Sequence, residues 1–140
     1  MVLFFTLLCL TGFAAAQTAR IAVMAHRGEQ IRNPENSLSG IRAAIDLGAD
    51  FVELDVRASL DGRQVLMHDA TVDRTTDGRG AIAQWTFGRI RALKLGNEGV
   101  PGFEEALDTA HEKIEVYVDA KDLTPAALNM RLKCTTCGGT

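Results

Sequence analysis

The chain has 140 residues, of which 46% are hydrophobic and 24% are charged, a length and balance that indicate one globular domain. Its formal net charge of -3 gives no basic field that would gather nucleic acid by counterion release, so we expect no nucleic-acid partner. An anionic substrate would have to be met by individual arginine or lysine side chains or by a bound metal ion.

Residues 1–16 have the pattern of an export signal. Residues 2–10 are apolar almost throughout, and Ala14-Ala15-Ala16 supplies the small residues of a cleavage site. We expect cleavage after Ala16 and a mature chain in the periplasm or outside the cell; a buried N-terminal helix is the alternative. The apolar run is shorter than the roughly 20 residues of a spanning helix, so no stable membrane anchor is expected.

Short apolar runs and helical patterns alternate in the first half of the mature chain. Residues 21–25 predict a strand that ends on His26, and residues 37–47 have apolar side chains at helical spacing before Gly48. Residues 51–56 alternate as a second strand. After a turn at Asp61-Gly62, residues 64–67 predict a third strand that ends at His68.

The second half begins with a polar loop at residues 71–80, followed by helical patterns at residues 86–93 and 102–111. A fourth strand is expected at residues 114–120, and a further helix at residues 125–132. This order favours an α/β fold with a mostly parallel sheet. A complete (β/α)8 barrel needs about 250 residues, so residues 17–133 would hold about the first half of one.

Residues 134–140 show no apolar periodicity and predict an irregular tail. Cys134 and Cys137 form one C-x-x-C pair, and no second Cys/His pair is placed to complete a zinc site. A disulfide or two free thiols is the expectation for an exported chain. The sequence gives no indication of oligomeric state.

Polar side chains at or near the ends of the predicted strands form the candidate site. Glu53 and Asp55 share one strand face because they are two residues apart. Two carboxylates this close on an apolar strand would repel each other and resist burial, and a divalent cation relieves both costs. Oxygen ligands suit Ca²⁺ or Mg²⁺. The alternative is a solvated strand face.

His26 and His68 follow strands on either side of this acidic pair in the sequence. Imidazoles can act as base and acid near neutral pH, and Arg27 with a cation could offset the charge on a phosphoryl group. The alternatives are structural or surface histidines and an ordinary ion-pair arginine. Near the end of the fourth strand, Asp119 and Lys121 share a face. Asp119 could be a third metal ligand and Lys121 a phosphate contact. The alternative is that the two form an exposed salt bridge.

Two other charged groups receive structural interpretations. Asp73 and Arg74 are adjacent in the polar loop and are most simply a loop ion pair, and His111 is expected on the surface of a helix.

The motifs that carry a resemblance are Ala25-His26-Arg27-Gly28, Asn33-Pro34-Glu35-Asn36-Ser37, Gly48-Ala49-Asp50-Phe51-Val52-Glu53-Leu54-Asp55-Val56, His68-Asp69 and Asp73-Arg74-Thr75-Thr76-Asp77-Gly78-Arg79-Gly80. In this order and spacing they resemble the glycerophosphodiester phosphodiesterase family over about residues 21–80. A weaker match continues to residues 119–121. The resemblance implies a phospholipase C-like TIM barrel that cleaves small-molecule glycerophosphodiesters to glycerol 3-phosphate and an alcohol.

The resemblance also implies roles for individual residues. It matches His26 and His68 to the acid/base pair, Arg27 to the phosphate-binding arginine, and Glu53 and Asp55 to ligands of a divalent cation. Glu35 lies in a motif that helps to build the site. Where the family usually has Glu-x-Lys, this chain has Asp119-Ala120-Lys121, one methylene shorter at the third ligand. Members of the family commonly carry a small insertion that corresponds to residues 70–105.

The family's barrel continues well beyond 140 residues. A chain of this length would expose sheet edges and core, so we expect it to be unstable and nearly inactive alone. Two alternatives stay open: a related phospholipase C-like or sphingomyelinase D-like enzyme, and a noncatalytic fragment that keeps the metal site. The preferred head-group alcohol is not indicated.

Overall fold

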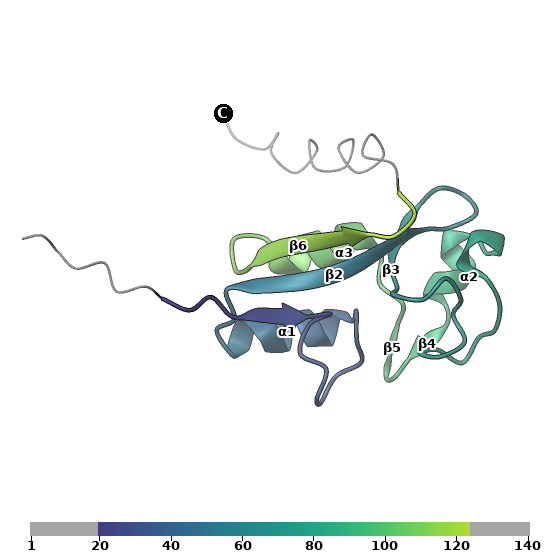
Figure 1. Cartoon of the computed structure of the whole chain (residues 1–140). Helices are drawn as coiled ribbons and strands as arrows, with labels where there is room; N and C mark the ends of the chain where they lie inside the picture. The colour runs from purple at the N-terminus through teal and green to yellow at the C-terminus, as the bar shows by residue number, and fades with distance from the viewer. Residues whose placement is uncertain (1–19, 124–140) are drawn as a thin grey trace, which may run out of the picture.

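The computed structural model describes residues 20–123. The expected export signal, the helix at residues 125–132 and the cysteine-containing tail lie outside these residues. Within them, β2 (Phe51–Ala58) is the central strand of a four-stranded sheet (Figure 1). It pairs in parallel with β1 (Met24–His26) and β6 (Glu115–Ala120), and antiparallel with β3 (Gln64–Leu66).

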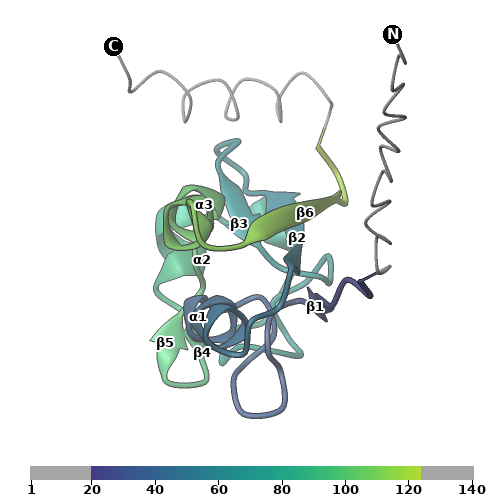
Figure 2. The same ribbon diagram turned by 90° about the vertical axis from the view of Figure 1, so that its left-hand side faces the viewer.

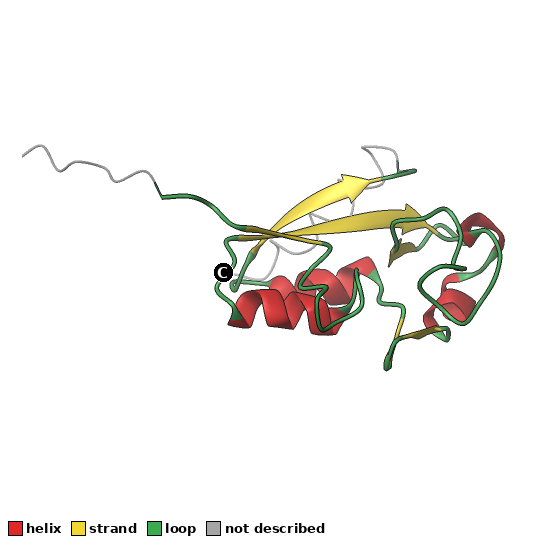
Figure 3. Cartoon of the chain, turned by 60° about the horizontal axis from the view of Figure 1, so that its bottom comes forward, coloured by secondary structure: helices red, strands yellow, loops and turns green. Residues whose placement is uncertain are grey.

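Two helices, α1 (Leu38–Asp46) and α3 (Phe103–Ala110), cover one face of this sheet (Figures 2 and 3). The Ser37 hydroxyl accepts a hydrogen bond from the Gly40 amide and so caps α1. The apolar residues of β2 that alternate with its acids point to the helices and form the core, which comprises Ile41, Val52, Leu54, Val56, Leu66, Phe103, Ala106 and Ala110.

The opposite face of the sheet therefore carries the side chains that alternate with these core residues along β2 and β6. It presents Phe51, Glu53 and Asp55 from β2, and Tyr117 and Asp119 from β6. In the described part of the chain, α1 and α3 both lie on the apolar side (Figure 3). The acidic residues are thus directed away from the core that the helices cover.

Residues 67–102, together with Val65 of β3, build a second apolar cluster beside the sheet. A 3-10 turn (Ile82–Gln84), α2 (Phe87–Arg91) and a hairpin of β4 (Lys94–Leu95) and β5 (Glu98–Gly99) surround it. Its buried members are Val65, Met67, Val72, Ile82, Phe87, Ile90, Leu95 and Val100. This segment largely overlaps residues 70–105, which the resemblance assigned to an insertion.

Most predicted elements are present, with three differences. The first strand is Met24–His26, later than residues 21–25, and the β4–β5 hairpin was not predicted. The third strand is antiparallel to β2, because the turn at Asp61-Gly62 is far too short for a parallel crossover. No described helix is long and apolar enough to cross a membrane.

Candidate functional site

Three carboxylates meet on the acidic face of the sheet. In the register of β2 and β6, Asp55 is paired with Asp119, and Glu53 lies two residues earlier on β2. One oxygen from each carboxylate lies within 4.8 Å of the others. Ligand oxygens at about 2.0–2.6 Å from one shared ion cannot be more than about 5 Å apart. The cluster therefore has the spacing and donor chemistry of a site that could hold a Ca²⁺ or Mg²⁺ ion.

The first two carboxylates are buried and have different electrostatic surroundings. Burial and then the charge of Asp55 raise the pKa of Glu53. Burial also acts to raise the pKa of Asp55, but a hydrogen bond from Asn36 and the ion pair with Lys121 outweigh it and hold the pKa low. The two groups thus resist ionising together, and a divalent cation between them would remove that cost.

Both predicted phosphate contacts lie against this cluster. Arg27 Nε is 3.2 Å from Asp55 Oδ2, and Lys121 Nζ is 3.0 Å from Asp55 Oδ1. Lys121 Nζ also lies 2.5 Å from Asp119 Oδ2, so the alternative salt bridge forms within the site itself. The hydrogen bond to Asp119 and then that to Asp55 raise the pKa of Lys121 and keep it cationic.

The turn after β1 gives Arg27 its position. Arg27 has φ +58°, and its amide donates to Glu53 Oε2 at 3.0 Å. Gly28 follows with φ +84°, and a Cβ there would come within 2.9 Å of the Gly40 backbone. The chain can therefore make this turn against α1 only with glycine at position 28.

Asn36 is a site residue to which the sequence interpretation gave no role. Its side-chain amide donates to Asp55 Oδ2 at 2.8 Å, and its side-chain oxygen accepts from the Asp55 amide at 3.0 Å. It has φ +55°, a conformation that asparagine tolerates better than most residues. Asn36 thus fixes the central carboxylate of the cluster from the loop before α1.

Replacing Asn36 with alanine should destabilise the protein by about 2–4 kcal/mol, because both hydrogen bonds are lost and alanine is strained at positive φ. Asn36→Gly loses the same hydrogen bonds without the strain, so it should be destabilised less. Comparing the free energies of unfolding of the two variants in urea separates the cost of the lost hydrogen bonds from the cost of the backbone strain. Wild-type stability in Asn36→Ala would contradict this role.

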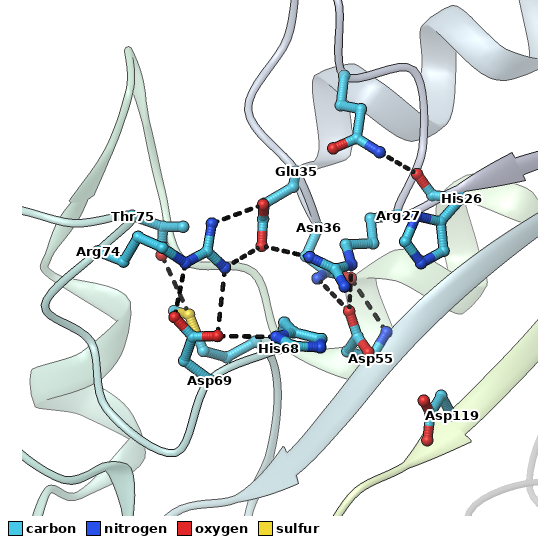
Figure 4. A network of polar contacts seen from close by, with 12 residues as sticks. His26, Arg27, Glu35, Asn36, Asp55, His68, Asp69, Arg74, Thr75 and Asp119 are labelled. Carbon is cyan, nitrogen blue, oxygen red and sulfur yellow. Dashed lines mark hydrogen bonds and ion pairs between the residues drawn. The ribbon is translucent and has the colours of Figure 1, made fainter.

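The two histidines reach the site by different routes. His26 ends β1, and its Nε2 lies 3.8 Å from Glu53 Oε2. His68 was expected at the carboxyl end of a parallel strand, but β3 runs back antiparallel to β2 and returns His68 alongside it. In the view of Figure 4, Arg27 and Asp55 lie between the two imidazoles. The predicted residues therefore gather in one region, although one step of the reasoning for His68 was wrong.

Charged side chains extend the site toward the loop after β3. His68 Nδ1 is 2.7 Å from Asp69 Oδ1, and Glu35 Oε1 is 3.3 Å from Arg27 Nη1. The predicted pair of Asp73 with Arg74 is wrong: the Asp73 carboxylate accepts from the Gly80 amide and closes the loop, which leaves Arg74 free to turn toward Glu35 and Asp69. His111 is exposed at the end of α3, as predicted.

Acid should weaken the contacts of Asp69. Hydrogen bonds from Arg74 and His68 lower the pKa of Asp69 from 3.8 to about 2. Since folding lowers this pKa, the ionised group stabilises the protein above about pH 4, and the contribution is lost as the pH falls toward 2. Thermal unfolding of wild type and Asp69→Asn should differ at pH 6 and converge below pH 3. A difference that grows on acidification would refute the assignment.

A cleft of about 480 Å³ lies elsewhere, between α2 and the start of α3, and is lined by Arg63, Phe87, Arg91 and Glu105 among others. No residue of the predicted site lines it. A smaller hollow of about 320 Å³ runs beside β1 and includes His26 in its wall. The roomier cleft is therefore separate from the carboxylate cluster.

Comparisons with known proteins agree on one family. Residues 26–131 match the Glycerophosphoryl diester phosphodiesterase family. Human Glycerophosphodiester phosphodiesterase 1 is 42% identical over 113 residues, which cover 73% of this chain and 34% of that protein. A Glycerophosphodiester phosphodiesterase of Caldanaerobacter subterraneus is 41% identical over 98 residues, which cover 69% of this chain and 40% of that protein. The chain thus spans about two-fifths of these relatives or less.

Solved structures show the same likeness. A glycerophosphodiester phosphodiesterase from Agrobacterium tumefaciens superposes with a TM-score of 0.79 at 31% identity, over 82% of this chain and 53% of that one. A phosphodiesterase from Oleispira antarctica, in complex with the product sn-glycerol-3-phosphate, gives a TM-score of 0.77 at 31% identity, over 81% and 52%. The expected fold class, part of a (β/α)8 barrel, is confirmed.

Proposed function

The chain belongs to the glycerophosphodiester phosphodiesterase family, and from that premise we propose that its site hydrolyses glycerophosphodiesters to glycerol 3-phosphate and an alcohol. The observation that carries the proposal is the pairing of Asp55 with Asp119 across β2 and β6, which gathers three carboxylates beside Arg27 and Lys121. The glycerol 3-phosphate bound to the Oleispira relative supports the substrate class.

Glu53, Asp55 and Asp119 are the residues that would hold a divalent cation, Ca²⁺ or Mg²⁺. When bound, the cation supplies positive charge to the phosphoryl oxygens of the substrate. Asp119 is one methylene shorter than the glutamate usual in the family. Its pairing with Asp55 nevertheless brings one of its oxygens within 4.8 Å of those of Glu53 and Asp55, which supports Asp119 as the third ligand despite the shorter side chain.

Arg27 and Lys121 would bind the phosphate that the cation faces. Arg27 Nε is buried and has no hydrogen-bond acceptor among residues 20–123, although Asp55 lies at ion-pair distance. A buried donor without an acceptor is costly, and a phosphoryl oxygen would satisfy it. Lys121 adds a second cation on the other side of Asp55.

The histidines move the protons. One takes the proton from water, whose oxygen forms the new bond to phosphorus. If the glycerol 2-hydroxyl attacks first, a cyclic phosphate forms, and water must then break its bond from O2 to phosphorus to give glycerol 3-phosphate. The other gives a proton to the alkoxide oxygen as its bond to phosphorus breaks. His26 is more exposed than His68, with side chains 59% and 34% accessible, so both rings can reach a substrate from solvent.

Product identity tests the proposed reaction. The full-length protein is incubated with glycerophosphocholine and Ca²⁺ or Mg²⁺, and the phosphorus products are followed by ³¹P NMR, with a chelated sample as control. Glycerol 3-phosphate as the cation-dependent product supports the proposal. A cyclic phosphate as the only product would favour a phospholipase C-like or sphingomyelinase D-like reaction. In the same assay on the 140-residue chain, cation binding without turnover would favour a noncatalytic fragment.

We also propose that the protein is exported to the periplasm or beyond the cell. The apolar run at residues 2–10 and the alanines up to Ala16 support this location. Sequencing the amino terminus of the exported protein tests it: a mature end at Gln17 is expected, and an uncleaved chain that stays inside the cell would overturn it.

A further inference from the structure

The guanidinium of Arg74 lies between two carboxylates and binds each through two nitrogens. Its Nη1 and Nη2 are 2.9 and 2.7 Å from the two oxygens of Glu35, and its Nε and Nη2 are 2.6 and 3.3 Å from those of Asp69. Only the planar fork of an arginine can bridge two carboxylates in this way. Glu35 and Asp69 would otherwise repel each other across the site.

Each of the two carboxylates also holds a residue of the proposed machinery. Asp69 Oδ1 lies 2.7 Å from His68 Nδ1, and Glu35 Oε1 lies 3.3 Å from Arg27 Nη1. Figure 4 shows the resulting chain of contacts, which runs from His68 through Asp69, Arg74 and Glu35 to Arg27. Arg74 is its central link.

The backbone that carries Arg74 is anchored in the second apolar cluster. Val72 is fully buried, the Asp73 carboxylate accepts from the Gly80 amide, and the Thr75 hydroxyl lies 3.2 Å from Met67 Sδ. The loop is thus fixed at several points on both sides of Arg74. Because the loop is anchored at these points, the Arg74 side chain keeps its position and its hydrogen-bond partners are oriented by it.

The contact with Asp69 also determines which nitrogen of His68 is available. An ionised carboxylate only accepts hydrogen bonds, so His68 Nδ1 carries the proton that it shares with Asp69. Nε2 is then the nitrogen left for the substrate. Orienting groups of this kind fix both the tautomer and the ring orientation of functional histidines.

We propose that Arg74 is a positioning residue, which orients the His68 imidazole through Asp69 and the Arg27 guanidinium through Glu35. The proposal rests on the proposed function. Arg74 thus has two arms, meaning two chains of contacts: the arm through Asp69 to His68 affects proton transfer, and the arm through Glu35 to Arg27 affects phosphate binding. Four of the five N–H groups of its guanidinium donate to the two carboxylates, so Arg74 acts mainly through Glu35 and Asp69 and not as a direct substrate contact.

Separate variants of the full-length protein test the two arms. Asp69→Asn should mainly lower kcat, Glu35→Gln should mainly raise KM, and Arg74→Gln should do both, with kcat reduced by about tenfold or more. Arg74→Lys keeps the charge but not the fork, so it should recover only part of the loss. Arg91→Gln is the matched control, because Arg91 pairs with Glu105 on α2 and α3 and should leave kcat and KM within about twofold.

A double-mutant cycle and a spectroscopic readout separate positioning from a structural role. Arg74→Gln should not lower kcat further when His68 is already alanine. In the cation-free protein, ¹⁵N NMR should show His68 with the proton on Nδ1, and a mixture of tautomers in Arg74→Gln, while His111 stays unchanged. Thermal unfolding identifies variants that fail to fold. If Arg74→Gln does not fold, Arg74→Lys supplies the same comparison.

The outcomes keep the two proposals apart. Full activity in His68→Ala would defeat the proposed function, whatever Arg74 does. An inactive His68→Ala together with wild-type kcat and tautomer in Arg74→Gln would overturn the positioning role alone. Additive losses in the double variant would also overturn it, because they would make Arg74 independent of His68.

Discussion

Replacing His26 or His68 with alanine is expected to lower kcat for glycerophosphodiester hydrolysis by about 10²–10⁴-fold, the usual contribution of a general acid or base. The fold should survive, because both side chains are partly exposed and neither belongs to an apolar cluster. Initial rates from released glycerol 3-phosphate and thermal unfolding of each variant measure the two effects.

His111→Ala is the matched control, since this histidine is exposed at the end of α3. It should change neither turnover nor stability appreciably. If His26→Ala or His68→Ala keeps more than about a tenth of wild-type kcat, that histidine falls outside the range for an essential acid or base and its assignment is wrong. Equal losses in all three variants would point to a general effect on the protein instead.

Glu53→Gln should sharply reduce the stabilisation that Ca²⁺ or Mg²⁺ gives to the protein and remove most activity. A cation at 100 times its dissociation constant stabilises the folded state by about 2.7 kcal/mol, and the loss of one of three charged ligands should reduce this sharply. Burial and Asp55 raise the pKa of Glu53, so its ionisation at pH 7 costs stability when no cation is bound. The cation-free variant should therefore be at least as stable as cation-free wild type.

Thermal unfolding with and without a chelator measures both parts of this prediction. Glu115→Gln is the control, because Glu115 is exposed at the start of β6, on the strand that also carries Asp119. It should keep the cation response. A normal cation response in Glu53→Gln would remove Glu53 from the proposed ligands, and a large loss of stability in the cation-free variant would contradict the electrostatic cost assigned to it.

The site residues that sequence predicted best are those that a strand places by itself. Glu53 and Asp55 share a face because strand side chains alternate, and this requires no knowledge of tertiary structure. Asp119 and Lys121 were open to two interpretations, because their meaning depends on the pairing of β6 with β2. The structure shows both at once: Asp119 pairs with Lys121 and also lies in the carboxylate cluster with Glu53 and Asp55.

What sequence did not predict depends on loops and on contacts between distant residues. Asn36 contacts Asp55 across 19 positions and has a positive φ that its Pro-Glu-Asn setting does not specify. Arg74 was assigned to its neighbour Asp73, although its partner Glu35 is 39 positions away. The antiparallel course of β3 was obtainable in principle, since the five residues between β2 and β3 permit a hairpin but no parallel crossover.

The position of a bound cation bears most directly on the proposed site. Crystals of the full-length protein soaked in Mn²⁺, which shares the oxygen ligands of Ca²⁺ and Mg²⁺, can be measured for anomalous scattering. The expected result is a peak within about 2.0–2.6 Å of oxygens from Glu53, Asp55 and Asp119, with His26 and His68 beside it. Saturating Mn²⁺ that leaves this cluster empty, or that binds only elsewhere, would contradict the assignment of the site.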